Sequence, residues 1–67
     1  MTNLKRIREE QGLSQSQLAE ASGVSIRNIQ YYEQRYRDIN KAQAITVYQI
    51  AMALGCNPED ILEIETT

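Results

Sequence analysis

Three glycines divide the 67-residue chain into short segments, and this punctuation restricts the fold more than any other feature. Gly12, Gly23 and Gly55 each follow a segment whose apolar residues recur at steps of three or four. That spacing is typical of an amphipathic helix, and a glycine directly behind it favours the left-handed residue that ends a helix. β-Branched residues never alternate over the length of a strand. The pattern therefore predicts an all-α fold of short helices.

Capping residues indicate where the first three helices begin and end. The first is expected over residues 4–11. The second begins with a capping box of the form S-x-x-Q at residues 14–17 and stops at residues 22–23. The third runs from Ile26 to about residue 34, because Ser25 is a good N-cap.

Two further helices are expected after an irregular loop at residues 35–41. The fourth covers residues 42–54, and Ile50 is expected to join the core from the edge of its apolar stripe. That stripe consists of Ala44, Val47, Tyr48, Ala51 and Leu54. The fifth helix is short and starts at Asn57-Pro58, since asparagine suits the cap and proline the first helical position.

Cysteine and histidine counts exclude several kinds of site. One cysteine and no histidine leave no internal disulfide, too few ligands for zinc, and no Ser–His or Cys–His nucleophile pair. No glycine-rich phosphate loop is present either. We therefore expect no enzyme activity, no metal and no cofactor. Cys56 is expected to fill the core; redox sensing is disfavoured, because the acidic Glu59 and Asp60 would not lower the pKa of its thiol.

Targeting and membrane segments are not evident in the sequence. Its longest uncharged apolar run, residues 50–54, is far shorter than the roughly 20 residues that span a bilayer. The first six residues lead into charges rather than into an apolar signal core. A lone thiol agrees with a reducing compartment. These features predict a cytoplasmic protein that does not contact a membrane.

Charge is distributed unevenly along the chain. The formal net charge is −2, yet residues 59–67 hold four acidic residues and no basic one. Residues 1–58 therefore carry seven basic and five acidic residues. Since a nucleic acid responds to local charge, the acidic total does not argue against binding by the mildly basic body.

The connection between the second and third expected helices is very short. Residues 22–25 form a turn that contains Gly23, and two short helices around such a turn make a helix-turn-helix. The tight turn prevents the helices from lying antiparallel. The third helix is therefore expected to project with one side free.

The chain resembles the Cro/phage-repressor-like (XRE-type) helix-turn-helix family of bacterial and phage transcriptional regulators over about residues 3–63. The likeness rests on residues 4–20, on Gly23-Val24-Ser25 followed by Ile29 and Glu33, and on Ala51, Leu54 and Gly55. It implies that residues 1–67 form a single compact five-helix DNA-binding domain of the lambda-repressor-like kind. Members generally bind double-stranded DNA as two-fold dimers.

The resemblance also implies that the third helix lies in the major groove. Its base-reading positions correspond to Ile26, Arg27, Asn28 and Tyr31. Arginine can donate two hydrogen bonds to guanine, and isoleucine can contact a thymine methyl group. Asparagine can pair with adenine or bind a phosphate. A solvated face without a partner is the alternative, but an exposed isoleucine and tyrosine beside an arginine are unusual on such a face.

Further positions are expected to contact the DNA backbone. Gln15 matches the family position that touches a phosphate and supports the first reading residue, whereas Gln17 is assigned to the capping box. The complete set is Ser14, Gln15, Ser25, Arg35, Tyr36, Arg37, Asn40 and Lys41. An ordinary solvated charge cluster is the alternative for the loop. Many members have Asn-Gly where this chain has Gln34-Arg35, which leaves open an extension of the third helix to Tyr36 or beyond.

Two residue pairs are expected to serve the structure or the assembly. Arg8 and Glu33 match a family ion pair that ties the first helix to the third. Ile45 and Met52 lie seven positions apart on one flank of the fourth helix and are candidates for a dimer surface. Scattered surface apolar residues are the alternative for Ile45 and Met52.

Together these features favour a repressor that acts by occlusion. A homodimer would place two reading helices in successive major grooves of a pseudo-palindromic operator, about 34–36 Å apart. The alternative keeps the fold but changes the role, to an antitoxin or another protein-interaction module. Its partner would then be a toxin or another regulator.

Overall fold

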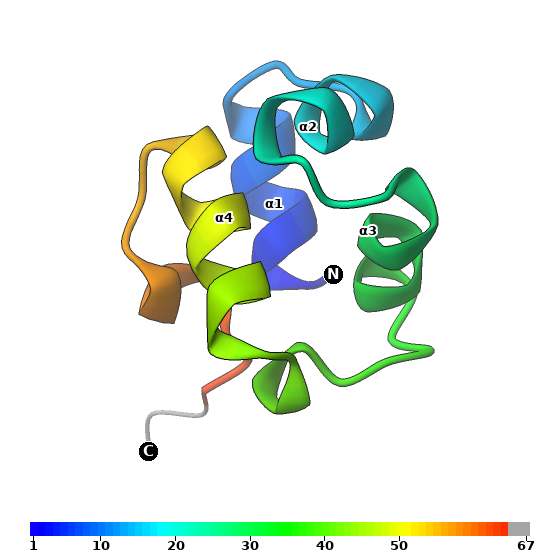
Figure 1. Ribbon diagram of the computed structural model, residues 1–67, viewed down its shortest axis with the longest axis vertical. Helices are drawn as coiled ribbons and strands as arrows, with labels where there is room; N and C mark the ends of the chain where they lie inside the picture. Colours follow the sequence, from blue (N-terminus) through cyan, green and yellow to red (C-terminus); the bar gives the residue numbers. More distant parts are fainter. Residues whose placement is uncertain (65–67) are drawn as a thin grey trace.

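The computed structural model describes residues 1–64, and this part of the chain is all-helical, as the apolar spacing predicts. Four α-helices and two short 3-10 helices follow one another, with no strand among the described residues. They are α1 (Asn3–Glu10), α2 (Gln15–Ser22), α3 (Ile26–Glu33), η1 (Ile39–Lys41), α4 (Ala44–Leu54) and η2 (Pro58–Ile61). α2 packs against both α3 and α4, while α1 contacts α3 and η2. α3 stands at the edge of the molecule (Figure 1).

The count of five helices is not confirmed, because the predicted fifth helix is the single 3-10 turn η2. The carboxylate of Asp60 accepts a 3.0 Å hydrogen bond from the backbone N–H of Asn57 at the start of this turn, and Ile61 is fully buried in the core. The backbone becomes extended at Leu62, so no second turn can form. Leu62 is held there through its carbonyl oxygen, which accepts a 2.8 Å hydrogen bond from the side-chain amide of Asn3.

The third helix does not extend to Tyr36. α3 ends at Glu33, and Arg35 takes a φ of 63° in the left-handed region that favours glycine. The backbone N–H groups of Tyr36 and Arg37 turn back to donate to the carbonyl oxygen of Tyr31. An arginine thus occupies a conformation that favours glycine, and the helix ends despite the missing glycine signal.

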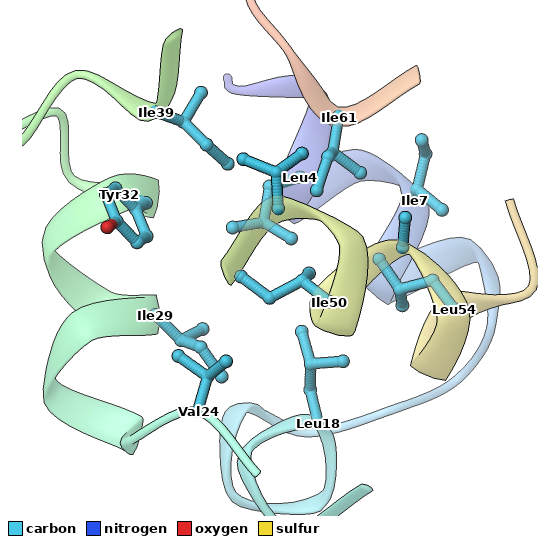
Figure 2. Packing of buried hydrophobic residues seen from close by; sticks show 12 residues of the cluster. Leu4, Ile7, Leu18, Val24, Ile29, Tyr32, Ile39, Ile50, Leu54 and Ile61 are labelled. Atoms are coloured by element: carbon cyan, nitrogen blue, oxygen red, sulfur yellow. The ribbon is translucent and has the colours of Figure 1, made fainter. Parts of the chain in front are cut away.

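The core is built from apolar residues of every helix, with Ile50 at its centre (Figure 2). Val47, Ala51 and Leu54 are buried as the stripe predicts. Ala44 and Tyr48, also assigned to the stripe, are exposed, whereas Ile50 is completely buried. The buried arc of α4 is therefore rotated from the predicted one, because α2 and η2 both pack against it.

Candidate nucleic-acid interface

α3 has a buried face and an open face. Ile29 and Tyr32 point into the core, and the N-cap Ser25 accepts a hydrogen bond from the backbone N–H of Asn28. On the open face Ile26 and Arg27 are exposed, while Asn28 and Tyr31 are half-buried. The four predicted reading residues therefore all lie outside the core. The turn before them is as short as expected, and Gly23 adopts a φ of 75° there.

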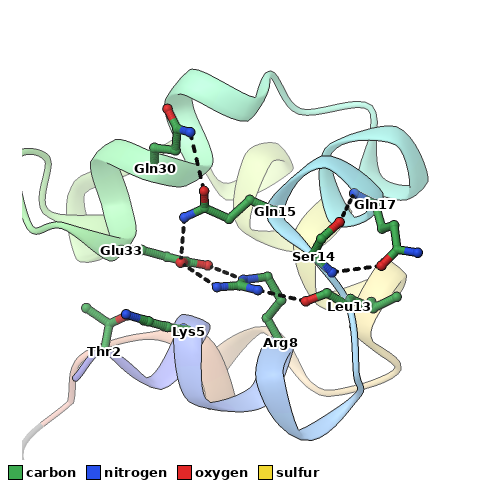
Figure 3. A network of polar contacts seen from close by, with 9 residues as sticks. All are labelled: Thr2, Lys5, Arg8, Leu13, Ser14, Gln15, Gln17, Gln30 and Glu33. Atoms are coloured by element: carbon green, nitrogen blue, oxygen red, sulfur yellow. Dashed lines mark hydrogen bonds and ion pairs between the residues drawn. The ribbon is translucent and has the colours of Figure 1, made fainter.

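A buried ion pair fixes the inner side of α3 to α1 (Figure 3). Nε of Arg8 lies 2.7 Å from Oε2 of Glu33, and Nη2 lies 3.0 Å from Oε1. Nη1 of Arg8 also donates to the carbonyl oxygen of Leu13 at 2.7 Å. The hydrogen bond to Glu33 raises the pKa of Arg8 above its usual value, although burial acts in the opposite direction. Three acceptor oxygens, two from Glu33 and one from Leu13, thus surround one buried guanidinium.

Gln15 connects this ion pair to the outer half of α3. Its Nε2 donates to Oε1 of Glu33 at 2.9 Å, and its Oε1 accepts from Nε2 of Gln30 at 3.3 Å (Figure 3). The residue that Gln15 supports is therefore Gln30, which sequence reasoning did not single out. No local pattern marks Gln30, because its partner lies fifteen positions away. Gln17 completes the capping box with Ser14, as predicted.

A cleft of about 550 Å³ lies between α3 and the start of α4. No side chain caps the N-terminus of α4 at Gln43. The lining residues are Asn28, Tyr32, Arg37, Asp38, Lys41, Ala42, Gln43 and Thr46. The cleft brings one predicted reading residue, Asn28, together with the cations Arg37 and Lys41. A helix N-terminus beside two cations suits an anion such as a phosphate. The sequence predicts that this helix starts at residue 42, so it did not identify Gln43 as the N-cap residue.

The loop behind α3 is organised around Tyr31. The ring of Tyr36 meets the ring of Tyr31 edge-on, with 6.0 Å between centroids. The guanidinium carbon of Arg37 lies 5.5 Å from the centroid of the Tyr31 ring. Arg35, Tyr36 and Arg37 are all exposed. The predicted phosphate contacts of this loop therefore lie next to the reading helix.

Asn40 is used differently from the other residues of the loop. Its side-chain Nδ2 donates to the carbonyl oxygen of Glu63 at 2.9 Å, and its Oδ1 accepts from the backbone N–H of Glu63 at 2.8 Å. Both ends of the amide are thus bonded to the C-terminal segment. The second hydrogen of Nδ2 is not used by these bonds, so a phosphate contact by the exposed Asn40 stays a prediction.

An apolar row runs along the outer side of α4. Ile45, Tyr48 and Met52 are each more than half exposed. None of the eleven residues of α4 is charged. The two residues predicted as a dimer surface therefore share one flank with a tyrosine that was assigned to the core.

Cys56 packs against the core and is half-buried. Burial, and to a lesser extent the nearby Asp60, raise the pKa of its thiol. A raised pKa keeps the thiol protonated and unreactive near neutral pH. This environment fits core filling rather than redox sensing.

Two short helices joined by a tight turn, the second with an open polar face, define a helix-turn-helix protein. The family model described as helix-turn-helix matches residues 4–61. The chain therefore belongs to the Cro/phage-repressor-like (XRE-type) helix-turn-helix family, a family of DNA-binding transcription regulators that are generally not enzymes. A search of the curated proteins finds no match. Within residues 1–64, no helix is long and apolar enough to cross a membrane.

Proposed function

We propose that the chain is a sequence-specific repressor that binds a pseudo-palindromic operator in double-stranded DNA as a homodimer. The observation that carries the proposal is the open face of α3 beside the cleft at the start of α4. Ile26, Arg27 and Asn28 are presented there on a helix whose opposite side is locked into the core. Their side chains match a thymine methyl group, guanine and adenine, respectively.

Phosphate contacts would flank this reading surface. Arg37, Lys41 and the uncapped start of α4 line the cleft and suit one phosphate group. Arg35 and Tyr36 extend the contact along the loop, while Ser14 and Ser25 lie at the starts of α2 and α3. Gln15 lies at the first turn of α2, beside Ser14. Such contacts fix the position of the protein on the duplex but do not select the sequence.

The apolar row of α4 supports assembly with a second copy. Ile45, Tyr48 and Met52 provide contact area, and an uncharged helix brings no like charges together when it meets its symmetry mate. The dimer would set the two α3 helices about 34–36 Å apart, the spacing of successive major grooves on one side of DNA. Occupation of the operator would then exclude the transcription machinery.

Selection from a random duplex pool tests this function. The purified chain is incubated with the pool at about 150 mM salt, a concentration at which non-specific binding is weak. We expect enrichment of an inverted repeat with half-sites about one helical turn apart. A folded chain that enriches no sequence would contradict the proposal.

A protein-interaction module, such as an antitoxin, is the second candidate, and the exposed apolar row of α4 is the observation that favours it. The same row could bind a toxin or another regulator instead of a second copy. Light scattering on the free chain and on a Met52→Glu variant separates the two cases. A dimer that dissociates in the variant supports the repressor. A monomer that selects no DNA favours the interaction module and directs the work to a partner.

A further inference from the structure

We propose that Tyr31 acts as a positioning residue, whose ring holds Arg37 ready for a DNA phosphate. This role replaces the base contact predicted for Tyr31, and it rests on the proposed function. Base selection is then left to Ile26, Arg27 and Asn28 at the start of α3.

Tyr31 organises the loop behind α3 with its main chain. The carbonyl oxygen of Tyr31 accepts hydrogen bonds from the backbone N–H groups of Tyr36 at 2.9 Å and of Arg37 at 3.3 Å. The left-handed conformation of Arg35 is what turns these two N–H groups back toward the helix. These two hydrogen bonds fix the start of the loop to α3.

The side chain of Tyr31 acts on the same two residues. Its ring is contacted on one side by the edge of Tyr36 and lies 5.5 Å from the guanidinium carbon of Arg37. An arginine at this distance from a tyrosine ring is attracted by the negative face of the ring. Among residues 1–64, the structure shows one cation–π contact, and it is this one between Arg37 and Tyr31. It restrains a long side chain that is otherwise exposed to solvent.

The restraint matters because of where Arg37 lies. Arg37 lines the cleft together with Asn28, Lys41 and the N-cap residue Gln43 of α4. The cleft also contains the acidic Asp38, so its two cations outnumber its one carboxylate. An unrestrained arginine would lose conformational freedom when it binds a phosphate, and that loss weakens binding. A guanidinium already held at the cleft loses less. The ring of Tyr31 therefore increases affinity without touching a base.

A set of variants at Tyr31 and Arg37 separates the ring from the hydroxyl group. The probe is the duplex enriched in the selection, and binding is measured over a range of salt concentrations. Tyr31→Phe keeps the ring, and we expect affinity within about twofold of the parent with unchanged base preference. Tyr31→Leu removes the ring, and we expect affinity to fall about two- to fivefold, the range of an exposed cation–π contact. The salt slope should then fall by up to about 0.9, one phosphate contact.

The double variant Tyr31→Leu/Arg37→Ala tests whether the two side chains act together. If the ring acts through the guanidinium, the double variant binds no more weakly than Arg37→Ala alone. Strictly additive losses in a chain that binds DNA would overturn the positioning role and leave the proposed function intact. So would a Tyr31→Phe variant that changes preference at one base pair, because the hydroxyl group would then read that base. Thermal melting of each variant confirms that it is folded.

A measurement on the free chain makes the geometry testable without DNA. NMR should show ring-current-shifted side-chain protons for Arg37, retained in Tyr31→Phe and lost in Tyr31→Leu. Absence of the shift in the parent chain would overturn the proposal directly. A chain that shows the shift but binds no duplex would refute the proposed function, and the positioning role with it.

Discussion

The inner and outer faces of α3 differ in almost every physical respect, although the helix has only eight residues. The inner face carries buried Ile29 and Tyr32 and ends in Glu33, whose carboxylate is bonded by Arg8 and Gln15. The outer face is exposed or half-buried, and among its four predicted reading residues Tyr31 is the one whose side chain makes an aromatic and a cation–π contact.

The contrast explains how a short helix can serve recognition. Eight residues are too few for an isolated helix to be stable in water. α3 is instead held by its caps and by the inner face, so its outer residues need not contribute to folding. Stability and DNA recognition should therefore separate by face, and each variant below tests that separation.

The largest effect is expected from Glu33→Ala on the inner face. The variant leaves Arg8 buried without its partner, which should cost about 3–5 kcal/mol of unfolding free energy. For a chain of this size such a loss lowers Tm by tens of degrees. Urea titration and thermal melting by circular dichroism measure it.

The control for Glu33→Ala is Glu10→Ala, which breaks an exposed pair between Arg6 and Glu10 on α1. A solvent-exposed pair four residues apart contributes only about 0.3–0.5 kcal/mol. A shift of less than one degree in Glu33→Ala, or one no larger than the control, would show that the inner face does not anchor α3.

The next largest effect is expected from Arg27→Ala on the outer face. Loss of a bidentate base contact should weaken specific binding by about 1–3 kcal/mol and relax preference at one base pair. Unfolding free energy should change by no more than about 0.5 kcal/mol, because the side chain is exposed. Fluorescence anisotropy with the selected operator and its single-base variants measures both changes.

Arg6→Ala is the matched control, since it removes the same charge from α1. Unchanged affinity and preference in Arg27→Ala would show that this residue is not a reader. Equal losses in both variants would indicate a general charge effect instead.

Gln15→Ala tests the link between the faces, because Gln15 contacts Glu33 and also Gln30. Loss of a hydrogen bond to a charged group should cost about 1.5–3 kcal/mol of unfolding free energy. Affinity should fall as well, since α3 would be held less firmly. Exposed Gln49 on α4 supplies the control variant Gln49→Ala. If stability falls and affinity does not, the two faces are independent even here.

The smallest effect is expected where α3 ends. Arg35→Gly relieves the left-handed conformation of a residue that has a Cβ, and should stabilise the fold by about 0.5–1 kcal/mol. Removal of the charge should at the same time weaken DNA binding and its salt dependence. Gln34→Gly, at a φ of −89°, is the control and should destabilise. A loss of stability in Arg35→Gly would show that the arginine is not strained.

Local features of the fold were predictable because their causes are local. The capping box of Ser14 and Gln17 and the end of α2 at Gly23 depend on residues within four positions. η2 was mistaken for an α-helix even so. Its first residues suit a helix start. The tertiary hydrogen bond from the Asn3 side chain to the carbonyl oxygen of Leu62, however, holds the backbone extended after one turn.

Residues of the candidate site were likewise predictable only where their arrangement depends on nearby positions in the sequence. The predicted readers come from one helix, and their shared face follows from helical spacing. The bonds of Asn40 to Glu63 join residues 23 positions apart, and no spacing rule reveals them. The exposure of Tyr48 was missed because periodicity gives the width of an apolar stripe but not which arc of it the neighbours cover.

The sequence by itself determined that the chain is helical, where α2 and α3 begin, and that these two helices form a helix-turn-helix. Those outcomes depend on caps, glycines and apolar spacing, which act over one or two turns. Only the tertiary structure decided the left-handed turn at Arg35 behind α3, the placing of Arg37 against Tyr31 and the linking of Gln30 to Gln15. These depend on which surfaces meet when the core closes, and residues far apart in the sequence decide that.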